Sequence, residues 1–106
     1  MNRKYIGFFS ENNLSMADNG SIYNFLVSKE QVNYSKDLVL RYLEKGRKEA
    51  TCPKIIFDIL TNKMISTHFT IITDGEYVWK SNLAYYIDKY NLYLPDDFIN
   101  KINNTK

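Results

Sequence analysis

Residues 73–98 read TDGEYVWKSNLAYYIDKYNLYLPDDF, and this stretch decides the fold of the chain. Asp74 and Gly75 separate two segments rich in β-branched and aromatic residues, 68–73 and 76–79. An Asp-Gly pair between such segments predicts a β-hairpin with a type I′ turn, because that turn requires positive φ at both central residues. Alternate side chains of the second strand should then face opposite sides of the sheet.

Two helices are expected after the hairpin. Ser81 or Asn82 can cap the first. Its apolar residues recur at i, i+3, i+4 and i+7 and form one stripe of Leu83, Tyr86, Ile87 and Tyr90. Pro95 suits the first turn of the second, because its missing N–H would have no helical partner there. The apolar face of that helix consists of Phe98, Ile99 and Ile102.

Upstream of the hairpin, the pattern predicts a short strand over residues 4–9 and a loop over residues 10–21 held by Leu14 and Met16. A helix over residues 36–45 should end at Gly46 in a left-handed conformation. The β-branched and aromatic residues of 54–60 favour a strand, and a helix beginning after Pro53 is the alternative.

This order of elements predicts one α+β domain spanning residues 1–106, with a small antiparallel or mixed sheet and helices packed on one face. At 106 residues and 44% hydrophobic composition, the chain is long enough for a core without disulfides. The single cysteine fits a reducing compartment, and no apolar run approaches the roughly 18 residues of a membrane span. We therefore expect a cytoplasmic protein with no membrane partner.

The charges are unevenly distributed along the chain. Residues 74–98 carry two basic and five acidic side chains, whereas residues 1–73 carry ten basic and seven acidic ones. An acidic patch could face a basic partner such as a nuclease. Asp74, Asp96 and Asp97 have sufficient local roles in turns and helix starts, which leaves Glu76 and Asp88 open for binding.

No residue pattern points to catalysis. His68 is the only histidine and Cys52 the only cysteine, and a zinc site usually requires three or four ligands. A Cys52–His68 nucleophile pair is conceivable, but a buried thiol and a strand histidine explain both residues better. The four glycines are too scattered for a phosphate loop. We expect no enzyme, no metal and no cofactor.

The 73–98 stretch resembles a recurring bacterial pattern: Thr-Asp-Gly, an aromatic strand with Trp, a Leu-x-Tyr-Tyr helix, then Leu-Pro-acid-acid-Phe. The pattern is similar to that of immunity proteins encoded beside polymorphic toxins, including those of contact-dependent growth inhibition. One departure is Lys80, where the pattern has proline, and it leaves the turn after Trp79 open. The matching residues are Thr73, Asp74, Gly75, Trp79, Leu83, Tyr85, Tyr86, Tyr90, Leu94, Pro95 and Phe98.

The resemblance implies that the chain binds a cognate toxin domain, the C-terminal part of a large secreted protein, and blocks its active site or substrate-docking surface. The acidic stretch favours a nuclease-type toxin. Tight inhibitor interfaces use aromatic anchors with a polar rim. The candidates, chosen off the core stripes or on the acidic stretch, are Glu76, Tyr77, Tyr85, Asp88 and Tyr93.

The alternative is a small nucleic-acid-binding or regulatory domain. It would use the basic run within residues 41–48, namely Arg41, Lys45, Arg47 and Lys48. Because Glu44 and Glu49 flank the densest part of this run, a solvated helix end explains it better.

Overall fold

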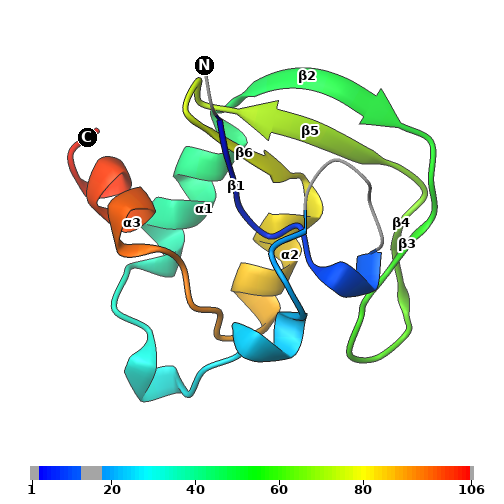
Figure 1. The fold of residues 1–106 in the computed structure, drawn as a ribbon, viewed down its shortest axis with the longest axis horizontal. Coiled ribbons are helices and arrows are strands. Elements are labelled where there is room, and N and C mark those ends of the chain that lie inside the picture. Colours follow the sequence, from blue (N-terminus) through cyan, green and yellow to red (C-terminus); the bar gives the residue numbers. More distant parts are fainter. Residues whose placement is uncertain (1–2, 13–17, 106) are drawn as a thin grey trace.

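Four strands form a mixed sheet in the order β1-β6-β5-β2 (Figure 1). The computed structural model describes residues 3–12 and 18–105. β1 runs parallel to β6, and the other neighbours are antiparallel. The strands are β1 (Lys4–Tyr5), β2 (Arg47–Cys52), β5 (Phe69–Thr73) and β6 (Tyr77–Lys80). The predicted α+β class is confirmed, and the sheet is of the mixed kind.

The predicted hairpin is confirmed as β5 and β6, but its turn differs from the expected one. Gly75 has a φ of 103°, whereas Asp74 does not have a positive φ. The Asp74 N–H donates to the Tyr77 carbonyl over 3.2 Å, so Gly75 and Glu76 are the central residues. Asp74 Oδ1 accepts from the N–H groups of Glu76 (2.9 Å) and Tyr77 (2.7 Å). These side-chain bonds hold Asp74 at the strand end, so the type I′ turn centred on Asp74 and Gly75 was wrong.

Three α-helices lie against one face of the sheet (Figure 1). Two starts follow local signals: in the first helix Ser35 Oγ accepts the Leu38 N–H, and the last helix begins directly after Pro95. The expected side-chain cap of the middle helix is absent, because Ser81 Oγ instead accepts the Thr70 N–H. Among the described residues no helix is longer than nine residues, and none is apolar enough to cross a bilayer. The helices are α1 (Lys36–Glu44), α2 (Asn82–Lys89) and α3 (Asp96–Asn103), and the 3-10 helices are η1 (Ser10–Asn12), η2 (Ile22–Asn24) and η3 (Lys29–Gln31).

The sheet has an apolar layer on each face. On the helix side, Tyr77 and Trp79 pack with the buried residues of α1, α2 and α3. On the other side, Val78 packs with Phe8, Ile56, Phe69 and Ile71. The expected alternation along β6 is therefore confirmed, and both faces of this strand are buried. Of the predicted helix-face residues, Tyr90 is half-buried at the end of α2, and the others are buried: Leu83, Tyr86, Ile87, Phe98, Ile99 and Ile102.

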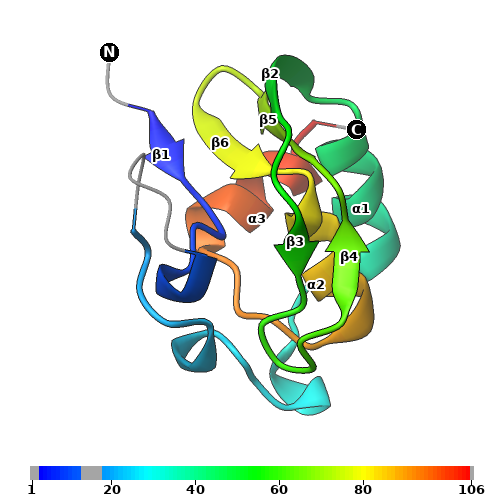
Figure 2. The ribbon, with the colours of Figure 1, turned by 90° about the vertical axis from the view of Figure 1, so that its right-hand side faces the viewer.

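A second, two-stranded sheet stands beside the first, formed by β3 (Ile56–Phe57) and β4 (Met64–Ser66). Figure 2 shows this hairpin at the front of the molecule. The strand prediction for residues 54–60 is confirmed in part, and the helix alternative is wrong. Ile56 is buried while Phe57 is exposed, which is strand alternation.

Gly46 does not end α1 in a left-handed conformation, because its φ is not positive. A Cβ on Gly46 would lie 2.4 Å from Ile72 Cγ2 and 2.8 Å from Trp79 Cζ2, so the residue is required for close packing. The chain enters β2 immediately afterwards, a strand that the sequence did not suggest. Leu14 and Met16, expected to anchor the loop over residues 10–21, lie outside the described residues.

Candidate partner-binding site

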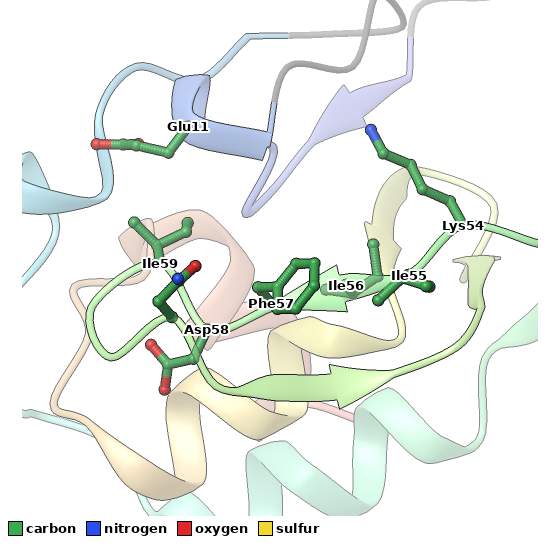
Figure 3. A pocket seen from close by; sticks show the side chains of 8 residues that line it. Glu11, Lys54, Ile55, Ile56, Phe57, Asp58 and Ile59 are labelled. Carbon is green, nitrogen blue, oxygen red and sulfur yellow. The ribbon is translucent and has the colours of Figure 1, made fainter.

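A pocket of about 410 Å³ lies between β3 and the 3-10 helix η1 (Figure 3). Most of its wall comes from one continuous segment, residues 54–59, and Glu11 stands on the opposite side. The lining therefore combines aliphatic and aromatic side chains with charged ones at its edges. The residues that line it are Glu11, Lys54, Ile55, Ile56, Phe57, Asp58, Ile59 and Asn62.

Three large apolar side chains are exposed on this hairpin, and we call them the hairpin patch: Ile55, Phe57 and Met64. Their exposed fractions are 53%, 47% and 60%. Phe57 and Met64 are direct partners in the β3–β4 register, so they lie side by side. Two of the three also line the pocket. An exposed apolar group on a strand hairpin that continues into a pocket is a typical protein-binding surface.

The hairpin is fixed to α2 by a buried carboxylate. Asp58 is 1% exposed and accepts hydrogen bonds from the hydroxyls of Tyr85 (2.6 Å) and Tyr90 (2.8 Å). It also accepts from the N–H groups of Leu60 and Thr61. Burial by itself would raise the pKa of Asp58, but these bonds outweigh it and hold the pKa at about 2. Figure 3 shows the carboxylate turned away from Glu11.

Tyr86 adds a second connection between α2 and the hairpin. Its hydroxyl accepts the Ile59 N–H over 3.0 Å and donates to the Phe57 carbonyl over 3.3 Å. The Lys89 ammonium lies 3.5 Å from Asp58 Oδ2 and completes the charge balance. The backbone beneath Phe57 is therefore held in place before any partner arrives, which lowers the entropy cost of binding.

The residues predicted to bind a partner are separated by the fold. Tyr77 is 3% exposed, and its ring centroid lies 4.8 Å from that of Phe98. Glu76 is exposed at the β5–β6 turn, where it pairs with Lys4 and Lys101. The turn precedes β6 and α2 follows it, so these two residues lie at the opposite end of that strand from α2.

The other three predicted residues lie on α2 or after it. Tyr85 is half-buried and donates its hydroxyl to Asp58, so its role in the fold is to hold the hairpin. Asp88 is exposed on α2. Tyr93 is 49% exposed, and its ring stands 6.4 Å from that of Phe25. Their part in binding stays a prediction, and the structure does not gather the five residues into one surface.

The β2–β5 register pairs Cys52 with Phe69, the neighbour of His68, but in the described part of the chain no hydrogen bond joins the Cys52 and His68 side chains. The basic run is divided between α1, the junction after it and β2. Cys52 is half-buried at the end of β2, and His68 is exposed before β5. Within residues 3–12 and 18–105, no three His, Cys, Asp or Glu side chains are grouped to hold a metal ion. Lys45 follows α1, whereas Arg47 begins β2 and pairs with Glu49 over 3.3 Å.

No family model, curated protein or solved structure matches this chain. The resemblance over residues 73–98 thus stands on its own. One signal for that site was present in the sequence: an acid inside the apolar run of residues 55–60, which a globular protein buries only with partners. The side-chain partners of this acid, Tyr85 and Tyr90, could be named only from the fold.

Proposed function

We propose that the chain is an immunity protein that binds a cognate toxin domain in the cytoplasm and neutralises it by contact. The observation that carries the proposal is the hairpin patch, an exposed apolar surface on a hairpin that Asp58 holds rigidly against α2. Rigid apolar anchors in the centre of an interface supply most of the binding free energy of protein inhibitors. The resemblance over residues 73–98 supports the toxin as the partner.

The surface differs from the one expected from the acidic stretch. Asp74 lies 3.2 Å from the Lys101 ammonium, and Glu76 pairs with Lys4 and Lys101, so two of the five acids of the stretch are balanced within the molecule. The other three, Asp88, Asp96 and Asp97, are exposed and have no ion pair among the described residues. A nuclease-type toxin would be favoured by free acidic charge at the interface, and the hairpin patch itself carries none. The proposal therefore concerns binding through the hairpin patch and leaves the nuclease class as an expectation.

The test is a pull-down with the tagged full chain from the source bacterium, with identification by mass spectrometry. We expect the C-terminal part of a large secreted protein in near one-to-one amount. The double variant Ile55→Ser/Phe57→Ser should lose it, since two central anchors each contribute roughly 2 kcal/mol or more. Tyr23→Ser is the matched control, because Tyr23 is 63% exposed on η2 and outside the patch.

Equal recovery with the wild type and the Ile55→Ser/Phe57→Ser variant would overturn the assignment of this surface. Recovery of nucleic acid in place of a protein, with a steep dependence on salt, would support the alternative that uses residues 41–48.

A further inference from the structure

The charged side chains around the pocket differ in whether they have a hydrogen-bond or ion-pair partner. Glu11 accepts hydrogen bonds from Ser21 Oγ and from the Ile22 N–H, and Asp58 is bound by α2 and its own turn. Lys54, in contrast, has no carboxylate within 4.0 Å in the part of the chain that the structure describes. Both acids of the pocket are thus occupied, and its positive charge is available.

A second ammonium group lies behind the pocket wall. Lys80 is 1% exposed, and among the described residues its Nζ has no hydrogen-bond partner. It stands 5.2 Å from the ring centroid of Phe8 and 5.9 Å from that of Phe69. Ile56 packs in the same cluster as these two rings and also lines the pocket. The rings that surround the buried ammonium thus belong to the same apolar cluster as one residue of the pocket lining.

We infer that the pocket receives an acidic side chain of the partner, flanked by apolar residues, with Lys54 as the accessible cation and Lys80 as the buried cation behind it. The apolar flanks would lie on Ile55 and Phe57 of the hairpin patch. This inference rests on the proposed function, because it states the chemistry of the partner surface that the same site recognises.

The free energy of the buried charge gives the physical reason. A buried ammonium without a hydrogen-bond partner is unfavourable, and natural proteins keep such groups mainly where function requires them. Burial, and to a smaller degree the Lys54 charge, lowers the pKa of Lys80 to about 8. A partner carboxylate would offset both the lost solvation of Lys80 and the repulsion between the two lysines.

The test uses the full chain labelled with ¹³C at the lysine ε-carbons and two probes, acetyl-Leu-Glu-Leu-amide and acetyl-Leu-Gln-Leu-amide. We expect the glutamate peptide to shift the NMR signals of Lys54 and Lys80 and to raise the pKa of Lys80, and the glutamine peptide to do neither. Equal shifts with both peptides, or shifts with neither, would overturn the inference.

Variants assign the effect to single lysines. Lys54→Met should weaken binding of the glutamate peptide about threefold to fivefold, as expected for one exposed ion pair. Lys80→Met should weaken it about twofold to threefold, because the buried ammonium acts on the carboxylate through space and not by direct contact. Lys29→Met is the control, since Lys29 is exposed on η3, outside the pocket lining, and without an ion pair among the described residues. Equal weakening by all three substitutions would show that the peptide responds only to the overall positive charge of the protein, and it would overturn the inference.

The two proposals fail in different experiments. If the peptides do not bind but the pull-down recovers a toxin in a patch-dependent manner, the function stands and the carboxylate contact is wrong. If the glutamate peptide binds at Lys54 and Lys80 but no toxin is recovered, the pocket chemistry stands and the immunity function is wrong.

Discussion

At the residue scale, Lys80 is a charged side chain in an apolar environment. Its ammonium is enclosed by Phe8 and Phe69, and its pKa of about 8 lies below the ordinary 10.5. Below pH 8 the Lys80 side chain is charged in both the folded and the unfolded chain. The full free-energy cost of burying that charge therefore lowers the stability of the folded chain in this pH range. Lys80→Met should therefore raise the free energy of unfolding at pH 7 by about 3 kcal/mol, as measured by urea denaturation.

The pH dependence of that gain is specific. Between pH 8 and 10.5 the folded chain loses the proton while the unfolded chain keeps it, so the wild type becomes more stable relative to the variant. The difference should have vanished above about pH 10.5. Lys29→Met, an exposed control, should show no such trend, and a Lys80→Met protein no more stable than wild type at pH 7 would contradict the assignment.

Asp58 shows the opposite behaviour, because its hydrogen bonds favour the charged form. Its pKa of about 2 lies below the ordinary 3.8, so it stabilises the fold fully above pH 3.8 and loses that effect as the pH falls toward 2. Asp58→Asn should lower the free energy of unfolding at pH 7 by about 2 kcal/mol or more, since an amide leaves buried donors unpaired. Urea denaturation of the wild type and of Asp58→Asn at pH 7 and pH 2.5 measures this loss of stability. An equal loss at both pH values would contradict a stabilising role of the charged carboxylate.

At the element scale, Gly46 joins α1 to β2 where Ile72 and Trp79 approach the backbone. Gly46→Ala introduces a methyl group 2.4 Å from Ile72 Cγ2, closer than atoms can stand, so the strand or the helix must move. We expect a loss of about 1–3 kcal/mol in thermal or urea denaturation. The neighbouring exposed change Lys45→Ala should stay within about 0.5 kcal/mol. A neutral Gly46→Ala would show that the junction is not tightly packed.

The elements that were predicted correctly are those that residues close in sequence specify. Asp74 and Gly75 marked the β5–β6 hairpin, and Pro95 marked the start of α3, because turn and cap residues act on their own neighbours. β2 was missed because five of its six residues are exposed, so no alternation of apolar residues marks it. Its pairing with β5 comes from the neighbouring strand and not from its own side chains.

The candidate site was less predictable than the fold. Its apolar members were visible as a strand-like run, but exposure of Ile55 and Phe57 depends on which face the hairpin turns outward. The hydrogen bonds from Tyr85 to Asp58 and from Tyr86 to the Phe57 carbonyl fix this orientation. Both tyrosines lie on α2, about 30 residues after the hairpin strand that they hold. Likewise, the sequence analysis ended the strand at Trp79 and left Lys80 open, whereas in the structure Lys80 is the last residue of β6 and its ammonium is buried beside Phe8 and Phe69.

At the scale of the whole molecule, the proposed binding role of the hairpin patch can be tested separately from the stability of the fold. A serine at Phe57 removes an exposed side chain, so the free energy of unfolding should change by about 0.5 kcal/mol or less. Bacteria that express the toxin domain found by the pull-down should grow when they also express the wild-type chain and fail to grow with Phe57→Ser. Tyr23→Ser should protect as the wild type does. Full protection by Phe57→Ser would contradict the role of the patch.

The parallel pairing of β1 with β6 has a consequence for synthesis on the ribosome. Lys4 pairs with Tyr77 and Tyr5 with Val78, so β1 can pair only after the much later β6 has been synthesised. Until then, the apolar residues Ile6, Phe8 and Phe9 that follow β1 lack most of the surface that later covers them. Contacts of such long sequence separation form late and slowly. During synthesis, the apolar segment 6–9 therefore lacks most of its packing partners until β6, α2 and α3 have left the exit tunnel.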